Sequence, residues 1–144
     1  MLSATARYAL RALVHLASRP DGEFLLGRHL SGIAGIPPNY LSKILWTLRS
    51  EGFIDATRGT GGGYRLQRRP EDIRLVQIVE LFDPARTGNE CLLNPDHPCS
   101  DATACAAHAE WKHVKAAYTN FLGHTTLAAL VANHVRGPQG EPVP

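Results

Sequence analysis

The chain has 144 residues, of which 44% are hydrophobic, and carries a formal net charge of +2. This length suits one domain with a single modest core. Its apolar runs are too short and interrupted for the roughly 20 residues that span a bilayer, and its N-terminus lacks the basic region and apolar block of a signal peptide. We therefore expect a cytoplasmic protein with reduced thiols and no membrane partner.

Basic residues concentrate in the first half of the chain. Residues 1–75 carry eleven Lys or Arg and six Asp or Glu, a net +5, whereas residues 76–144 carry four and seven, a net −3. Ten of the eleven N-terminal cations are arginines, whose planar group suits phosphates and guanine edges. A GC-rich genome would also enrich arginine, so this asymmetry favours nucleic-acid binding only in combination with a suitable fold.

Three helices are predicted in the first fifty residues. Apolar residues at helical spacing indicate a helix over residues 2–18, which a turn at 20–22 ends. A short helix is predicted over residues 27–34, with Gly35 closing it. Two prolines then open a helix over residues 38–50. Its apolar stripe consists of Leu41, Ile44, Leu45 and Leu48.

The remaining elements alternate in type. Strand-like runs at residues 53–58 and 64–68 flank a glycine-rich connection and predict a hairpin. A helix is predicted from residue 70 to residue 82, and residues 84–104 read as a loop. A long helix is predicted from residue 105. One seam along this helix is formed by Trp111, Val114, Tyr118, Phe121 and Leu122. A short helix over 126–131 and a tail over 136–144 complete the prediction.

Two short helices joined by a tight turn and followed by a hairpin predict a winged helix-turn-helix, with residues 38–50 as the recognition helix. The expected fold class is therefore mainly α, with a small β-hairpin wing and a long C-terminal helix. Polar side chains away from the apolar stripe can reach base edges or phosphates. The predicted DNA contacts are Asn39, Tyr40, Ser42, Lys43 and Arg49 in the helix, and Arg58, Gly59, Thr60 and Arg65 in the wing. Trp46 is given no role, because it could equally be a residue at the edge of the core.

All three cysteines of the chain lie in one fifteen-residue stretch, Cys91-x7-Cys99-x5-Cys105, followed by His108. Three is odd, so the cysteines cannot all pair in internal disulfides, and thiolates are ligands for soft metals and iron–sulfur clusters. The segment predicts a metal or cluster site with the three cysteines as ligands. The fourth ligand could be His108, the loop residue His97, or an external or partner-derived group.

Three other functions are weighed against this reading. An RNA-binding zinc finger is disfavoured because the loop between the cysteines has no aromatic residue for base stacking. A Cys–His enzyme lacks an Asp or Asn partner motif. A phosphate-binding loop is excluded because no Gly-Lys-Ser/Thr follows the glycine run. A cluster-free thiol switch and a structural zinc site on the same fold stay open as alternatives.

Three segments carry a resemblance to a known family: RYALRAL at residues 7–13, PNYLSKIL at 38–45 and RGTGGGYRL at 58–66. Together with the spaced cysteines, they resemble the bacterial iron–sulfur-sensing winged-helix transcriptional regulators typified by the cluster-assembly regulator IscR and the nitric-oxide sensor NsrR. The resemblance covers residues 1–135. It implies a homodimer, joined by the long helix, that binds a partly palindromic double-stranded DNA operator under the control of an iron–sulfur cluster.

The resemblance also implies site residues and domains. The cluster-assembly regulators use Cys-x5-Cys-x5-Cys with a histidine three residues later, so the last gap and His108 match, while the first gap is two residues longer. Some nitric-oxide sensors take a carboxylate from the partner's first helix, where this chain has Arg7 and Tyr8. A [2Fe-2S] cluster is favoured and [4Fe-4S] is the alternative. The expected domains are a DNA-binding domain (1–82), a cluster loop (83–108), a dimerisation region (105–135) and the tail.

Overall fold

The computed structural model describes residues 2–20, 23–84, 90–94 and 96–136, without the side chains of the last two. The predicted tail beyond residue 136 lies outside the described residues. Among the described helices, none combines the length and the apolar character needed to cross a membrane.

Three helices form the body of the N-terminal half: α1 (Ala4–Ala17), α2 (Gly27–Ala34) and α3 (Pro38–Ser50). The side chain of Ser3 caps α1 by accepting a hydrogen bond from the backbone N–H of Ala6 at 3.1 Å. Gly35 ends α2 with φ at 65°, a left-handed conformation that favours glycine. The predicted bounds of the second and third helices are confirmed, and the first helix is shorter at both ends than predicted.

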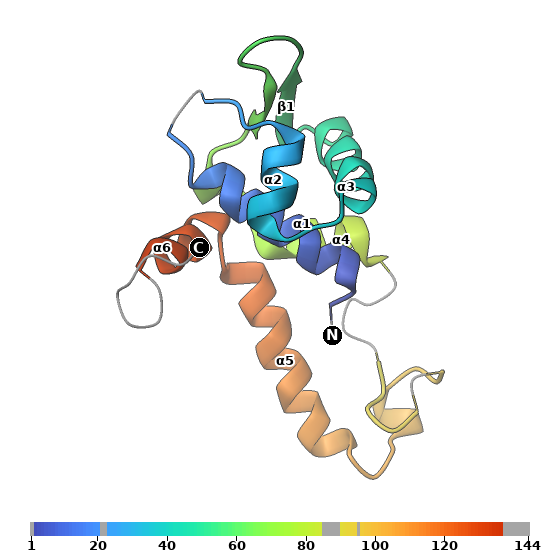
Figure 1. Cartoon of the computed structure of the whole chain (residues 1–144). Helices are drawn as coiled ribbons and strands as arrows, with labels where there is room; N and C mark the ends of the chain where they lie inside the picture. Colours follow the sequence, from blue (N-terminus) through green and yellow to red (C-terminus); the bar gives the residue numbers. More distant parts are fainter. Residues whose placement is uncertain (1, 21–22, 85–89, 95, 137–144) are drawn as a thin grey trace.

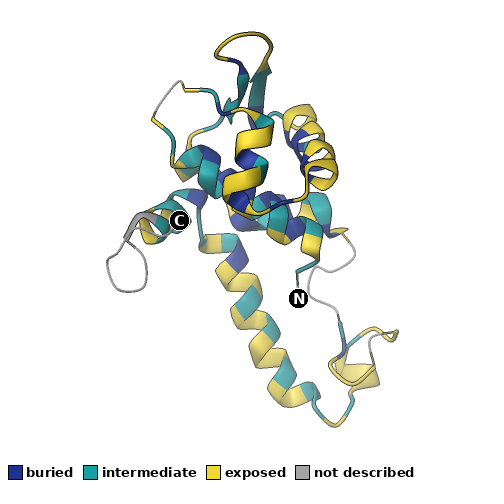
Figure 2. Ribbon diagram, viewed as in Figure 1, coloured by how far each residue is buried: buried dark blue, intermediate teal, exposed yellow. Residues whose placement is uncertain are grey.

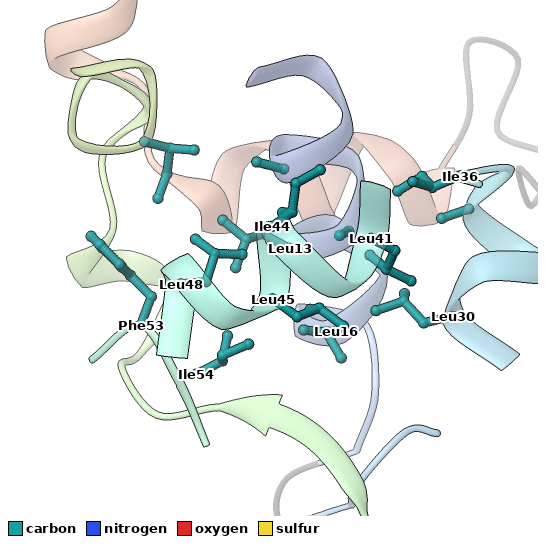
Figure 3. Close-up of a cluster of buried hydrophobic side chains, with 14 of the residues drawn as sticks. Leu13, Leu16, Leu30, Ile36, Leu41, Ile44, Leu45, Leu48, Phe53 and Ile54 are labelled. Atoms are coloured by element: carbon teal, nitrogen blue, oxygen red, sulfur yellow. The ribbon is translucent and has the colours of Figure 1, made fainter. Parts of the chain in front are cut away.

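The hydrophobic core lies between these helices and the elements that follow (Figure 3). The predicted stripe of α3 is buried, because Leu41, Ile44, Leu45 and Leu48 are each at most 2% exposed. These side chains pack with residues of α1 and α2, among them Leu13 and Leu30. Burial of this face fixes the orientation of α3, so its opposite face points to solvent.

Strands β1 (Ile54–Thr57) and β2 (Gly63–Leu66) form an antiparallel hairpin in which Asp55 pairs with Arg65. The backbone of Leu25 exchanges two 2.8 Å hydrogen bonds with Tyr64, which ties the hairpin to the segment before α2. Gly63 allows this close approach, because its φ is 136° and a Cβ there would overlap the Leu25 carbonyl. The base of the hairpin is therefore anchored, while its tip projects from the body (Figure 1).

The helix predicted over residues 70–82 is wrong in its first half. A 3-10 turn, η1 (Pro70–Asp72), is followed by extended backbone at Ile73, and α4 covers only Leu75–Phe82. The reason is a pair of long-range backbone hydrogen bonds: Leu75 N–H donates to Thr125, and Ile73 accepts from Leu127. These bonds join the segment to the connection between the last two helices and keep it out of the helical conformation.

Helices α5 (His108–His124) and α6 (Leu127–Arg136) end the described chain. The long helix begins three residues later than predicted, because residues 105–107 form a turn in which His108 N–H donates to Cys105 at 3.1 Å. The last helix is longer than predicted, since Leu127 enters the main core and its helix packs on α1. By contrast, α5 projects from the body with most of its surface exposed, and the cysteine segment lies at its far end (Figures 1 and 2).

Candidate functional site

The predicted DNA-contacting residues of α3 form its solvent-facing side. Asn39, Tyr40, Ser42, Lys43 and Arg49 are all exposed, because the core takes up the opposite face of the helix. The Ser42 hydroxyl donates to the Pro38 carbonyl at 3.0 Å, so its hydrogen already has an acceptor within the helix. The Tyr40 ring lies 6.2 Å from the Tyr8 ring of α1, and this contact holds the start of α3 beside α1.

The tip of the hairpin lies next to this face. Arg58, Gly59 and Thr60 are exposed, and a hollow of about 570 Å³ lies between the end of α3 and the hairpin. Arg49 and Arg58 both line this hollow, so two cations from different elements face one concave surface. A surface of this shape and charge can follow a nucleic-acid backbone.

Arg65 differs from the other predicted contacts. Its guanidinium forms an ion pair with Asp55 across the hairpin at 3.7 Å and lies 4.4 Å from the centroid of the Phe24 ring. Lys43, Arg49 and Arg58, in contrast, form no ion pair with any described residue. Among the predicted contacts, the cations without an ion pair are therefore on α3 and at the start of the hairpin connection.

The cysteine segment brings its four predicted ligands together as two close pairs. The sulfurs of Cys91 and Cys105 lie 3.4 Å apart, and the Cys99 sulfur lies 3.2 Å from Nδ1 of His108. All three cysteines are free thiols. His97 is exposed, and its side chain makes no hydrogen bond or ion pair with the described residues. The structure thus places His108, and not His97, beside a cysteine.

An acidic residue that the sequence analysis missed fixes the His108 ring. Nε2 of His108 donates to Oδ1 of Asp101 at 2.8 Å, and the same carboxylate oxygen accepts from Lys112 at 3.4 Å. These partners lower the pKa of Asp101, the hydrogen bond from His108 having the largest effect. With its proton on Nε2, the imidazole presents the Nδ1 lone pair to the Cys99 side. No sequence periodicity links positions 101 and 108, because a turn brings them together.

The thiol of Cys91 is set up to ionise. The hydrogen bond between Cys91 and Cys105 lowers the pKa of Cys91 below its usual value, burial opposes this shift, and nearby backbone N–H groups and Cys99 add smaller lowering effects. Cys91 is buried, and the segment that carries it is held against α5 because Trp111 donates from Nε1 to the carbonyl of Glu90 at 2.8 Å.

A polar junction connects this segment to the N-terminal half of the chain. Asp83, at the end of α4, is only 6% exposed and accepts hydrogen bonds from both the backbone N–H and the hydroxyl of Ser3. The Tyr118 hydroxyl of α5 is buried without a hydrogen-bond partner among the described residues. Desolvation, and then the charges of Asp83 and Glu90, raise the pKa of Tyr118. Asp83 therefore holds the first helix to the point where the chain leaves for the cysteines.

Two further exposed residues were missed on the helix-turn-helix. Trp46, which the sequence analysis left without a role, is 70% exposed on the open face of α3. Arg28 is exposed on α2 and forms no ion pair with the described residues. Helical periodicity could have placed Trp46 on that face, whereas the free state of Arg28 depends on tertiary neighbours.

Known proteins with a similar sequence are transcriptional regulators. The model of the Rrf2 family, described as an iron-dependent transcriptional regulator, matches residues 2–133. An HTH-type transcriptional regulator of Aquifex aeolicus is 32% identical over 133 residues, which cover 91% of each chain. The HTH-type transcriptional regulator IscR of Escherichia coli O1:K1 / APEC is 28% identical over 132 residues, which cover 92% of this chain and 80% of that protein.

Solved structures show the same fold. CymR (YrzC), the global cysteine regulator of B. subtilis, aligns with a TM-score of 0.73 at 23% identity, covering 92% of this chain and 96% of that one. T. potens IscR aligns with a TM-score of 0.69 at 22% identity, covering 97% and 93%. The predicted fold class is confirmed, and the relatives are named as transcriptional regulators, not as enzymes. Since the family match spans both the winged helix and the cysteine segment, this chain belongs to the Rrf2 family of transcriptional regulators.

Proposed function

We propose that this protein is a homodimeric DNA-binding regulator whose operator binding is controlled by an iron–sulfur cluster held by Cys91, Cys99, Cys105 and His108. The observation that carries the proposal is the donor set itself. Three thiols and one imidazole come from a short loop and the first residue of α5 and form two close pairs, at 3.4 and 3.2 Å. Thiolates are the usual ligands of such clusters, and histidine replaces cysteine in some of them.

The donors fit a cluster better than a single ion. Among the described residues, no group of three or more His, Cys, Asp or Glu side chains is arranged to hold one metal ion. Two sulfurs on one tetrahedral metal at about 2.3 Å lie roughly 3.7 Å apart, close to the observed Cys91–Cys105 spacing. Two pairs of donors therefore favour a [2Fe-2S] cluster over a lone zinc ion, with [4Fe-4S] as the alternative. When bound, such a cluster supplies one-electron chemistry and lability toward oxidants.

The residues of this chain would hold and tune that group. The lowered pKa of Cys91 favours the thiolate that a metal requires. Asp101 orients His108, and a neutral imidazole in place of a fourth thiolate makes that position easier to lose on protonation. One weakly held ligand suits a sensor, because a small chemical change can release it.

For DNA binding, the free cations on α3 and the hairpin support a winged-helix mode. Residues 38–50 would lie in the major groove, Lys43 and Arg49 would contact phosphates, and Arg58 would reach a phosphate or the minor groove. Arg65 would stabilise the hairpin through Asp55 and Phe24 more than it contacts DNA. We assign residues 1–82 to this DNA-binding domain, joined by α6, which packs on α1.

The exposed face of α5 supports a dimer. A 17-residue helix is marginal in water without tertiary packing, yet only Leu122 of α5 is buried. Val114 and Phe121 are 48% and 50% exposed, and with Trp111 and Tyr118 they follow the 3–4 spacing of a coiled-coil seam. A second copy laid along this seam within the 105–135 region would cover these side chains.

Coupling between cluster and DNA would pass through the segment after α4. Loss of the cluster would free the 91–108 loop, and Asp83, where α4 ends, is bonded to Ser3 at the beginning of α1. A shift of this junction would move α4 and α1 and change the spacing of the two recognition helices. Operator half-sites have fixed spacing, so a small change in separation alters affinity.

Anaerobic purification tests the proposal. Iron, acid-labile sulfide and the visible spectrum are measured, followed by affinity for a DNA site selected from a random pool, before and after chelation. We expect brown protein with iron and sulfide and a changed affinity after cluster removal. Colourless protein that contains zinc would contradict the cluster, and equal affinity in both forms would contradict the coupling.

The DNA surface has its own test. Removal of one phosphate contact lowers the slope of log K against log salt by about 0.9, so Arg58→Ala in both protomers should lower it by roughly 1.8. Arg69→Ala is the matched control, because Arg69 is already paired with Glu71 and Asp72. Equal slopes for the Arg58 variant and wild type would show that the hairpin does not contact the backbone.

A second candidate function is a cluster-free thiol switch. The 3.4 Å contact between Cys91 and Cys105 and the lowered pKa of Cys91 favour it, because a thiolate beside a second thiol is prone to form a disulfide on oxidation. Protein isolated without any metal, with a Cys91–Cys105 disulfide after peroxide treatment by mass spectrometry, would support this function. A full complement of iron and sulfide would contradict it.

A further inference from the structure

Trp46 lies at the centre of the open face of the recognition helix. At about 100° per residue, it falls opposite the buried stripe of α3, together with Asn39, Lys43 and Ser50. At 70% it is the most exposed of the large hydrophobic side chains that the structure describes. Its ring makes no hydrogen bond, ring stacking or cation contact with the described residues.

Nothing within the chain explains this exposure. A large aromatic ring gains favourable free energy by leaving water, so a partner that covers the indole would be stabilised by this contact. Lys43 and Arg49 lie three residues before and after Trp46 on the same helix and form no ion pair with the described residues, and Arg49 and Arg58 line the nearby hollow. A polyanion is therefore the partner whose charge complements the cations near Trp46. Double-stranded DNA is the polyanion that the proposed function supplies.

The chemistry of the groove narrows the contact further. In the major groove, the apolar group that distinguishes one base pair from the others is the C5-methyl of thymine. The indole is a large apolar ring with a single donor, so a methyl group suits its carbon edge better than an acceptor-rich guanine edge does. Trp46 lies seven residues beyond Asn39, or roughly 10 Å along the helix, so the two side chains meet different parts of the groove.

Building on the proposed function, we propose that Trp46 is a specificity-determining residue that packs against the methyl group of one thymine in each operator half-site. Lys43 and Arg49 hold the helix in register through phosphates, while Trp46 distinguishes sequences.

The experiment removes single methyl groups from DNA. A duplex site is selected from a random pool with wild-type protein, and each thymine in turn is replaced by 2′-deoxyuridine, which lacks only the 5-methyl. Affinity is measured by fluorescence anisotropy. One methyl group is worth about fourfold, or roughly fifteenfold when it is lost from both half-sites. For wild type, we expect uridine replacement to lower the affinity by these factors at one symmetric pair of thymine positions. For Trp46→Ser, uridine replacement at the same positions should not change the affinity.

Two control measurements distinguish a contact with the thymine methyl group from a general effect of the Trp46 substitution. Trp46→Phe keeps an aromatic ring and should keep part of the methyl sensitivity. Because Trp46 is exposed, Trp46→Ser should fold normally, and its affinity for an unrelated duplex should match wild type. The chain has two tryptophans, Trp46 and Trp111, so the emission of wild type minus that of Trp46→Ser isolates the Trp46 signal, which should shift to shorter wavelength when the selected duplex binds.

The outcomes are distinguishable. Methyl sensitivity that is the same in wild type and Trp46→Ser would overturn the inference, as would a wild-type protein indifferent to every uridine replacement. In either case the DNA-binding function would stand. A wild-type protein that binds no DNA, selected or unrelated, would overturn the proposed function and this inference with it.

Discussion

The hydrogen bond between Asp101 and His108 offers the sharpest test of the cysteine site. Asp101→Ala removes the carboxylate that accepts from Nε2 of His108 at 2.8 Å. Without it the imidazole can place its proton on either nitrogen and rotate, so Nδ1 no longer presents a fixed lone pair on the Cys99 side. The variant should still fold, because Asp101 lies in a short exposed 3-10 turn, η3 (Asp101–Thr103), and takes no part in the core.

The size of the effect follows from the surroundings of Asp101. Loss of an outer carboxylate partner of a ligating histidine typically weakens metal binding 10- to 100-fold. The Asp101 side chain is 80% exposed, so water can replace part of its role, and we expect about tenfold faster loss of cluster iron. Asp101→Asn keeps an oxygen acceptor but loses the charge that attracts Lys112, so its effect should be smaller.

The assay follows the visible absorbance of anaerobically reconstituted protein after addition of an iron chelator. Asp96→Ala is the matched control, since Asp96 lies exposed in the same loop and contacts neither cysteine pair. The expected order of release rates is Asp101→Ala fastest, then Asp101→Asn, with Asp96→Ala equal to wild type. If Asp101→Ala releases iron within twofold of the control, the carboxylate does not position His108, and the assignment of His108 as a ligand loses its structural support.

Three further predictions concern stability and assembly. Ser3→Ala removes a helix cap worth about 1 kcal/mol and a hydrogen bond to the buried Asp83 carboxylate worth about 2 kcal/mol. Urea denaturation should therefore show that the free energy of unfolding falls by about 3 kcal/mol. A decrease below about 1 kcal/mol would mean that the junction is not rigid. Burial, then His134 and Arg11, lower the pKa of His15, so the unfolded chain takes up a proton first as pH falls below about 6.5. Melting temperature should therefore drop between pH 7.5 and 5.5, and less steeply in His15→Gln; parallel curves would show that His15 does not contribute. Phe121→Asp places a charge in the proposed seam and should convert the dimer to a monomer, as measured by light scattering. Asn120→Asp, one residue away, should stay dimeric. A dimeric Phe121→Asp protein would place the interface elsewhere.

Much of the fold could be predicted because its signals are local. The bounds of α3 follow from two prolines at its start and an apolar stripe that repeats every turn, and both are encoded within thirteen residues. The hairpin follows from a glycine-rich turn between two short strands. The helix predicted from residue 70 was wrong because its first residues bond to backbone some fifty positions later, and no local pattern reports such a partner.

The same division holds for the site. Cysteine spacing alone identified the candidate ligands, and the sequence placed His108 three residues after the last of them. Only the folded chain paired Cys91 with Cys105 and Cys99 with His108, brought Asp101 behind the imidazole, and tied Arg65 to Asp55.

The sequence by itself thus determined which chemical groups this regulator carries and which helix faces are apolar, because residue identity and helical period need no partner. The tertiary structure decided which groups meet and which stay free. Trp46 shows the difference: its place on the wheel is a property of the sequence, whereas its 70% exposure depends on how Leu41, Ile44, Leu45 and Leu48 dock into the core. The packing of these four side chains in the core, and not the helix propensity of the sequence, makes the Trp46 indole face solvent on the same helix as the unpaired Lys43 and Arg49.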